Sequence, residues 1–282
     1  MTKKSGFILF VLFFLTIGVV WFGQDYQKKQ KLELLETNGS SQINKNDTDL
    51  KKEKNEVSKT EAFEKNRNQK TILDYISTVP KDDGKKVVSF YGDFSKSENW
   101  LLSVGKYINE QANEQVKFNY VALPNFDSYR LLEENTVSSL KEENPDLVFF
   151  QIPIYGDQVR DISLSDSTDY IIQDYEAIKQ ALPDTLVVFV TPNPSSSRKE
   201  DYNSRTLVYT SYLDTILETV KENNLPLFDL HEAFNAEITS MGFALENTLA
   251  EDGKTLNDKG NEIYATVFNQ ELMVPVDTTT GK

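Results

Sequence analysis

The 282-residue sequence predicts an α/β domain of three layers (α/β/α), in which helices cover both faces of a five-stranded parallel sheet, preceded by one transmembrane helix. Five short runs of apolar residues, rich in Val and Phe, are typical of buried strands. Between them lie longer stretches whose apolar residues recur at helical spacing, and a parallel sheet needs such crossovers. Near the start of the chain, 18 consecutive residues carry no charge.

The uncharged segment Gly6–Gly23 (GFILFVLFFLTIGVVWFG) reaches the lower end of what spans a bilayer as a helix, at roughly 20 residues. Trp21 and Phe22 suit the membrane interface. The alternative is a cleaved signal peptide, whose apolar core is only about 7–15 residues long and precedes a small-residue cleavage site. Because this run is longer and continues into WFGQDY, we predict an uncleaved signal anchor over residues 6–23.

The orientation of this anchor follows from the positive charges around it. Residues 1–5 are expected to be a cytoplasmic head, because Lys3, Lys4 and the amino terminus are positively charged. Three further lysines follow the span closely and act against this orientation. We expect a single-pass protein of the cell membrane whose larger part lies outside the cytoplasm.

The polar segment 24–70 is rich in Lys, Glu, Asn, Gln, Ser and Thr and shows no sustained apolar periodicity. It cannot bury enough apolar surface to offset the entropy of ordering, so we predict a disordered stalk. The remaining domain, residues 71–282, contains 17 basic and 35 acidic residues, a net charge of −18. Such a surface repels nucleic acid, which is therefore not an expected partner. The chain has no cysteine, and neither a cofactor nor a metal site is expected.

The elements of the domain follow in order along the chain. KVVSFY, DLVFFQI and TLVVFV are nearly continuous apolar runs, VKFNYVAL alternates, and LPLFDL is a shorter fifth run. The predicted strands are Lys86–Tyr91, Val116–Leu123, Asp146–Ile152, Thr185–Val190 and Leu225–Leu230. The predicted helices are Asn99–Ala112, Leu131–Glu143, Thr168–Leu182, Leu207–Asn224 and Asn257–Leu272.

Ligands of open parallel sheets bind beyond the carboxyl ends of the strands, where successive loops converge. Four loops occupy that position in this prediction: Gly92–Glu98, Pro124–Tyr129, Pro153–Arg160 and Thr191–Arg198. The approach to the last helix is expected to join them.

Six stretches carry a resemblance to a known family: FYGDFS, ALPNFDSYRLL, PDLVFFQIPIYGD, VTPNP, PLFDLHEAF and EDGKTLNDKGNEIYA. Their order from Lys86 to about Leu272 resembles the SGNH or GDSL hydrolases. The resemblance implies a flavodoxin-like sheet, a nucleophilic serine directly after Gly-Asp, and a late Asp-x-x-His pair. It also implies a glycine and an asparagine that bind the oxyanion, and a role on envelope glycans or their acyl esters.

The reacting groups of that family are replaced here. Phe94 stands where the resemblance places the nucleophile, and Thr255 stands where it places the histidine. A threonine hydroxyl does not accept a proton near neutral pH, so Thr255 cannot act as the general base. Asp93 and Asp252 are retained.

The oxyanion-binding positions have also changed. The family glycine falls at Asn125, a residue type that tolerates the left-handed backbone. The family asparagine falls at Tyr155 without a gap in the alignment, or at Gly156 with one gap, followed by the matching Asp157.

Two residues are candidates for substitute chemistry. Ser95 lies one position beyond the expected nucleophile, and its alternative role is turn formation or capping of the helix near Asn99. His231 is the only histidine, and with Asp229 and Glu232 it is more typical of a solvated helix start than of a metal site.

Other side chains near the same edge of the sheet suit a polysaccharide. Arg198 and Lys199 either hold an anionic substituent or form a solvated surface pair. Tyr91, Phe94, Tyr155 and Tyr202 either form a platform that stacks on sugars or pack in the core.

Three functions remain open from the sequence. The first is a catalytically impaired relative that binds envelope glycan or assists an envelope enzyme. The second is a carbohydrate esterase or O-acetyltransferase that uses Ser95 with an unusual base, and Asp252 and His231 are the other catalytic candidates. The third is a structural spacer. On chemistry alone the first is favoured, since losing both serine and histidine costs several orders of magnitude in rate.

Overall fold

The computed structural model describes residues 66–77, 85–112 and 116–281. The predicted head, the membrane anchor and nearly all of the stalk lie outside these residues. Within the described part of the chain, no helix is both long and apolar enough to cross a bilayer.

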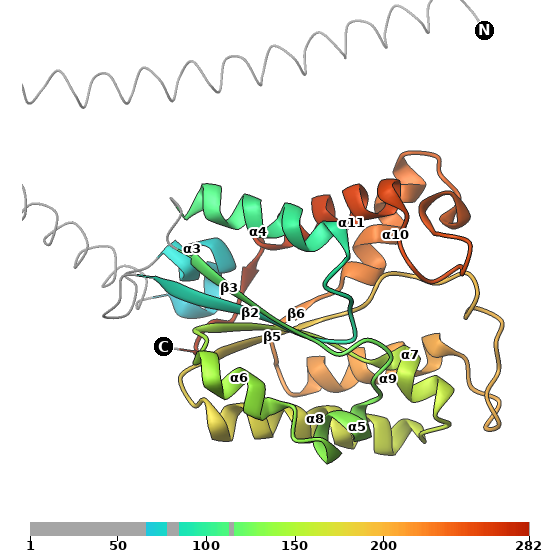
Figure 1. Ribbon diagram of the computed structural model, residues 1–282, viewed down its shortest axis with the longest axis horizontal. Helices are drawn as coiled ribbons and strands as arrows, with labels where there is room; N and C mark the ends of the chain where they lie inside the picture. Colours follow the sequence, from blue (N-terminus) through green and yellow to red (C-terminus); the bar gives the residue numbers. More distant parts are fainter. Residues whose placement is uncertain (1–65, 78–84, 113–115, 282) are drawn as a thin grey trace, which may run out of the picture. The chain divides into compact units, whose positions relative to one another are not determined.

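A five-stranded parallel sheet forms the middle layer, as the sequence predicts (Figure 1). Its strands are β2 (Lys86–Gly92), β3 (Val116–Ala122), β4 (Leu147–Gln151), β5 (Leu186–Val190) and β6 (Leu227–Phe228). Their order across the sheet is β3-β2-β4-β5-β6, the flavodoxin-like arrangement. Gly92 pairs with both Ala122 and Gln151, so β2, β3 and β4 end at the same edge.

Helices cover both faces of this sheet (Figure 1). One face carries α3 (Ile72–Ser77), α4 (Asn99–Gln111), α10 (Leu230–Ser240) and α11 (Asp258–Glu271). The other carries α5 (Ser128–Glu133), α6 (Val137–Glu143), α7 (Ile154–Val159), α8 (Leu164–Ala181) and α9 (Tyr209–Glu222). Each face has its own hydrophobic core, because alternate residues of a strand point to opposite sides: Phe90 and Phe149 belong to one core, Tyr91 and Phe150 to the other.

The structure corrects several predicted boundaries. The predicted helix Leu131–Glu143 is two helices, separated near Asn135, whose left-handed backbone (φ 49°) ends the first. The segment Pro153–Arg160, predicted as a loop, is largely α7. The fifth strand is only two residues long, since Asp229 caps α10 immediately after it by accepting a hydrogen bond from the Glu232 amide.

The two ends of the domain are tied to each other. β1 (Lys70–Thr71) pairs antiparallel with β7 (Pro275–Val276). The Arg67 guanidinium donates to the Thr278 carbonyl at 2.7 Å and to the Gly281 carbonyl. The packed part of the chain therefore begins before residue 71.

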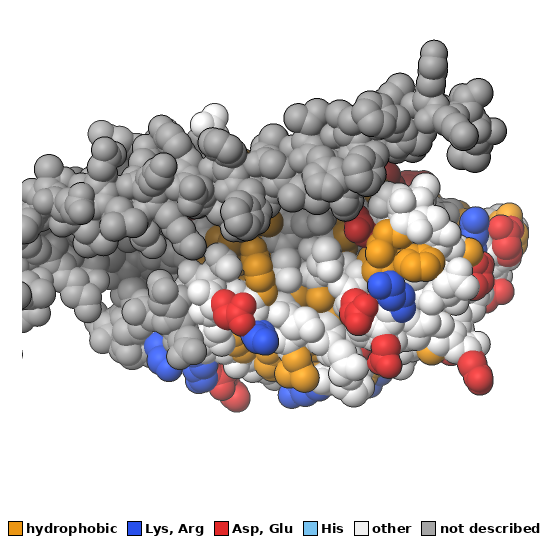
Figure 2. All heavy atoms as spheres, turned by 90° about the horizontal axis from the view of Figure 1, so that it is seen from above, with side chains coloured by type: hydrophobic (Ala, Val, Ile, Leu, Met, Phe, Trp, Pro, Cys, Tyr) orange, Lys and Arg blue, Asp and Glu red, His pale blue; other side chains and the backbone are white. Residues whose placement is uncertain are grey.

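The visible part of the face formed by α4, α10 and α11 carries both positive and negative side chains (Figure 2). Acidic and basic side chains lie among hydrophobic ones there. Large exposed apolar residues on or just after these helices are Leu102, Met241, Phe243, Met273 and Val274.

Candidate functional site

A cleft of about 500 Å³ lies at the carboxyl ends of the strands, where the loops were expected to converge. It includes the boundary between β2 and β4, the point at which the strand order reverses. Its lining comprises Asp93, Phe94, Ser95, Ser97, Glu98, Asn99, Pro124, Asn125, Gln151, Tyr155, Pro192, Asn193, Asp252, Lys254, Thr255, Leu256, Asp258 and Asn261. We call this space the cleft.

The Gly-Asp turn after β2 forms one wall of the cleft. Gly92 has φ +123°, and a Cβ there would lie 2.2 Å from the Gln151 carbonyl oxygen, so only glycine fits. The turn is held by the Gln151 side-chain amide, which donates to the Asp93 carbonyl at 2.8 Å. The Asp93 carboxylate accepts a hydrogen bond from the backbone amide of Asn125 at 2.7 Å. Burial raises the pKa of Asp93, although Lys254 and this amide oppose the shift.

Phe94, at the expected position of the nucleophile, packs into the core. Its side chain is only 3% exposed, and its ring lies edge-on to Trp100 at a centroid distance of 6.3 Å. The residue contributes apolar surface to the floor of the cleft and no reacting group.

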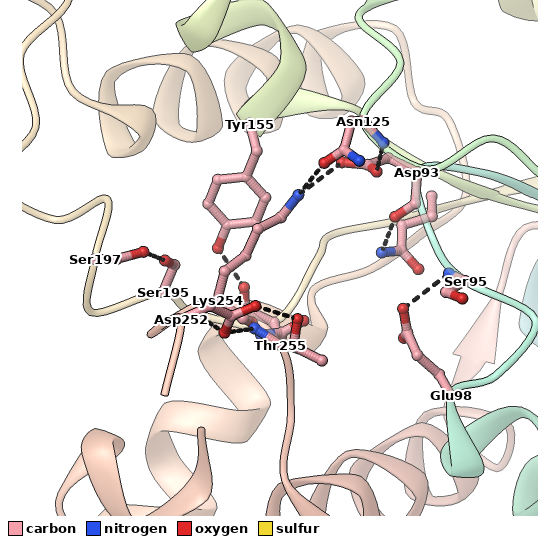
Figure 3. A network of polar contacts seen from close by, with 12 residues as sticks. Asp93, Ser95, Glu98, Asn125, Tyr155, Ser195, Ser197, Asp252, Lys254 and Thr255 are labelled. Carbon is pink, nitrogen blue, oxygen red and sulfur yellow. Dashed lines mark hydrogen bonds and ion pairs between the residues drawn. The ribbon is translucent and has the colours of Figure 1, made fainter. Parts of the chain in front are cut away.

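Ser95 belongs to a turn before α4. Its hydroxyl lies 2.8 Å from the Ser97 hydroxyl and accepts a longer bond from the Ser97 amide. Its amide donates to the Glu98 carboxylate at 2.8 Å (Figure 3). Among the described residues, its hydroxyl forms no hydrogen bond with a histidine or a carboxylate, and its contacts are those of a turn.

Glu98 is a cleft residue that the sequence reasoning did not single out. Besides the Ser95 amide, its carboxylate accepts a hydrogen bond from the Trp100 indole. Burial raises its pKa, these hydrogen bonds lower it, and the charge of Asp93 adds to the rise.

Asp252 and Thr255, the positions of the family's Asp-x-x-His pair, contact each other. The Thr255 hydroxyl donates to the Asp252 carboxylate at 2.6 Å, and the Lys254 and Thr255 amides donate to its other oxygen. Burial acts to raise the pKa of Asp252, but these hydrogen bonds outweigh it and the pKa lies below its usual value. Gly253 (φ +64°) accepts hydrogen bonds from Ser195 and Ser196, so this turn is fixed to the loop after β5.

Lys254, also not anticipated, reaches across the cleft from this turn (Figure 3). Its ammonium group lies 3.7 Å from the Asp93 carboxylate and 3.3 Å from the Asn125 side-chain oxygen. It also lies 5.3 Å from the centre of the Tyr155 ring. The only sequence signal for this role was its position inside the Asp-x-x-His segment.

The expected oxyanion positions lie in or beside the cleft. Asn125 does adopt the left-handed backbone (φ 62°). The Tyr155 ring lines the cleft, and its hydroxyl donates to the Asn193 carbonyl. Gly156 lies against the backbone of Phe126, where a Cβ would be 2.1 Å from the carbonyl oxygen.

Asp157 does not line the cleft and is fully buried. Its carboxylate accepts bonds from the Ser128 amide at 2.7 Å, the Ser128 hydroxyl at 3.0 Å and the Ser167 hydroxyl. Burial raises its pKa to about 6, against the effect of these hydrogen bonds. Asp157 therefore joins α7 to α5 and α8.

His231, the candidate base, does not line the cleft. Its ring nitrogens lie 3.3 Å from the Tyr209 hydroxyl and 3.4 Å from the Asn235 side-chain nitrogen. Burial lowers its pKa, opposed by Asp229 and Asp214. No group of acidic, histidine or cysteine residues in the described ranges is arranged to hold a metal ion.

The aromatic platform considered from the sequence is not formed. Tyr91 is fully buried on the far face of the sheet, with its hydroxyl 2.7 Å from that of Thr136. Tyr202 is 67% exposed and lies outside the lining of the cleft. Of the four residues, only Phe94 and Tyr155 line it.

No family model matches the sequence, and no curated protein matches it. Several solved structures share the fold. A GDSL-like lipase from Parabacteroides merdae matches with a TM-score of 0.51 at 16% identity, covering 68% of this chain and 99% of that one. An acetylxylan esterase from Geobacillus stearothermophilus matches with a TM-score of 0.52 at 15% identity, covering 67% and 95%.

A carbohydrate esterase family 3 protein from Talaromyces cellulolyticus gives a TM-score of 0.53 at 17% identity, covering 66% of this chain and 96% of that one. Sequence identities this low support a shared fold but not a shared function. The strand order, the cleft beyond the strands and these three structures together give the described domain the α/β fold of the SGNH hydrolases.

Proposed function

We propose that this chain is a membrane-anchored, extracytoplasmic protein of the cell envelope that binds glycan in the cleft and is impaired as a serine hydrolase. One observation carries the proposal: the cleft retains the place and the polar lining of an esterase site, but among the described residues neither of its serine hydroxyls, Ser95 and Ser97, contacts a histidine or a carboxylate. Phe94 and Thr255 occupy the reacting positions, and the hydroxyl of Ser95 contacts that of Ser97.

The lining of the cleft suits a saccharide. Amide side chains both donate and accept hydrogen bonds, as sugar hydroxyls require, and Asn99 and Asn125 line the cleft. The side-chain nitrogens of Asn193 and Asn261 already donate to backbone carbonyls. Gln151 is 7% exposed, and its side-chain oxygen is buried without a hydrogen-bond partner among the described residues. Because an unsatisfied buried acceptor is costly, a ligand hydroxyl at this oxygen stabilises the complex. The carbohydrate esterases among the similar structures support a saccharide ligand.

A second candidate is an active carbohydrate esterase or O-acetyltransferase with Ser95 as nucleophile. The observation in its favour is Glu98, a half-buried carboxylate with a raised pKa that already contacts the Ser95 amide. A carboxylate with a raised pKa is suited to general base catalysis near neutral pH. To act as this base, the Glu98 carboxylate would have to turn from the backbone amide of Ser95 to the hydroxyl of Ser95.

The two candidates differ in reactivity. The full-length chain, purified in mild non-ionic detergent, is treated with a fluorophosphonate probe and with p-nitrophenyl acetate. We expect no labelling and no hydrolysis above the buffer rate, because no base contacts the Ser95 hydroxyl. Labelling that is lost in Ser95→Ala but kept in the matched control Ser97→Ala would establish the esterase instead.

Binding is tested on the same protein by isothermal titration with acetylated xylotetraose and with chitotetraose. We expect at least one to bind, and Gln151→Leu to weaken it by about tenfold or more. One lost hydrogen bond to the ligand accounts for about 1.4 kcal/mol, and the variant also loses the bond that holds the Asp93 carbonyl. If neither these saccharides nor charged ones such as tetragalacturonate bind, and the probe does not react, both candidate functions are contradicted.

A further inference from the structure

A second hollow adjoins the cleft, and we call it the side pocket. It has a volume of about 500 Å³. Its lining is Asn125, Asp127, Tyr155, Gly156, Val159, Arg160, Arg198 and Lys254. Asn125, Tyr155 and Lys254 also line the cleft, so a ligand in the cleft has the side pocket within reach.

The side pocket is positively charged, in contrast to the net charge of −18 over residues 71–282. It contains three cationic side chains and one carboxylate. That carboxylate, Asp127, is 5% exposed and already accepts bonds from the Arg130 amide at 2.9 Å and the Arg160 guanidinium at 3.2 Å. Its negative charge is compensated by Arg160, which leaves Arg198 and Lys254 to set the sign of the pocket.

Lys254 is partly neutralised, because its ammonium group lies 3.7 Å from the Asp93 carboxylate. It is positioned on the boundary between the two spaces, above the Tyr155 ring. A negative group in the side pocket can contact Lys254 without breaking this pair, since an ammonium group has three donors.

Arg198 forms no hydrogen bond and no ion pair with any residue that the structure describes, although it lines the side pocket. A guanidinium presents several donors in one plane and binds an oxyanion through two parallel hydrogen bonds. An unpaired arginine at the wall of a pocket, on a strongly acidic domain, is therefore suited to a ligand oxyanion.

We infer that the side pocket binds an oxyanion substituent, a carboxylate or a phosphate, carried by the saccharide that occupies the cleft. Arg198 is the principal donor, and Lys254 joins the two subsites. The inference rests on the proposed function, and it narrows the ligand to anionic glycans.

The test compares two ligands of one backbone: tetragalacturonate and its fully methyl-esterified form, which has the same sugars without the charges. The full-length chain in non-ionic detergent is titrated with each. We expect the acid to bind at least tenfold more tightly than the ester at low salt, and the difference to shrink as salt is added. Comparing the binding of galactose 6-phosphate with that of galacturonate then shows whether the side pocket prefers a phosphate or a carboxylate.

The substitution Arg198→Ala is expected to abolish the difference between acid and ester by weakening binding of the acid to the level of the ester. Lys199→Ala is the matched control, because it removes the same charge from the next residue, which lies outside the pocket lining. Equal binding of acid and ester would overturn the inference while leaving glycan binding intact. An equal effect of Lys199→Ala would also overturn it, since the attraction would then be a diffuse surface effect. Failure of both ligands to bind would contradict the inference, and if the neutral saccharides also fail, the proposed function falls with it.

Discussion

Asp174 is fully buried in α8, and neither of its carboxylate oxygens has a hydrogen-bond partner among the described residues. Burial, with a smaller effect from Asp157, raises its pKa to about 9. The residue is therefore protonated in the folded protein at neutral pH, whereas in the unfolded chain a carboxyl of this type ionises near pH 4. As the pH rises, Asp174 therefore ionises only in the unfolded chain, and this stabilises the unfolded state relative to the folded state.

Asp174→Asn is accordingly expected to stabilise the protein at pH 7 and above. The folded pKa of Asp174 is raised, so the contribution of this residue to the free energy of unfolding is fully present below about pH 4. It is lost progressively as the pH rises towards 9, by up to about 1.4 kcal/mol per pH unit. The variant avoids this loss. Thermal unfolding followed by circular dichroism at pH 5, 7 and 8.5 measures the difference, with the exposed Asp169→Asn on the same helix as control. A difference independent of pH would show that Asp174 is not protonated in the folded state.

Among the elements, the short helix α7 packs its backbone directly against the backbone of a neighbouring segment. Gly156 in α7 lies against the backbone of Phe126 and Asp127, so close that any Cβ would overlap the Phe126 carbonyl. This contact, together with the buried Asp157 below it, sets the position of Tyr155 at the cleft. Placement of α7 therefore depends on a residue that has no side chain.

Gly156→Ala is expected to destabilise the domain by about 1–3 kcal/mol or more, since an added methyl group cannot be accommodated without moving backbone. Gly105→Ala in α4 is the matched control: its added Cβ would meet only side-chain atoms at 3.4 Å or more. Alanine is the better helix former by about 1 kcal/mol, so this variant should be neutral or more stable. Urea unfolding of both variants makes the comparison. Equal effects would contradict the assigned packing of α7.

For the molecule as a whole, the expected organisation is a charged extracytoplasmic domain held at a membrane by residues 6–23. An acidic domain has no electrostatic attraction to anionic lipid, so in this proposal the attachment depends on residues 6–23. The described residues contain no alternative span.

Expressed in a Gram-positive host, the full chain should sediment with membranes, resist extraction by alkaline carbonate, and be degraded by protease added to intact protoplasts. A chain without residues 1–23 should be found in the soluble fraction. Release of the full chain by carbonate, or a truncated chain that still sediments, would contradict anchoring by this segment. Protection from protease would reverse the orientation.

Much of the fold could be predicted because its signals are local. Val- and Phe-rich runs identified the five strands, and apolar spacing identified the four longest described helices, α4, α8, α9 and α11. α10 was missed although Leu230, Phe234 and Ile238 recur at intervals of four, because the capping Asp229 follows a strand of only two residues. The prediction of one helix over Leu131–Glu143 was wrong because the turn at Asn135 depends on a single left-handed residue inside an apolar pattern.

By itself the sequence determined the order of the layers and the loops that meet at the cleft, since both follow from short-range patterns. The expectation that Phe94 and Thr255 stand at the reacting positions rests on the resemblance to the SGNH hydrolases. Only the tertiary structure decided that His231 lies apart from Ser95, that Lys254 spans the cleft to Asp93, and that Arg198 faces a pocket of positive charge. The physical reason is distance along the chain, because Asp93 and Lys254 lie far apart in the sequence. The packed sheet and helices create their contact, and no local pattern around either residue specifies it.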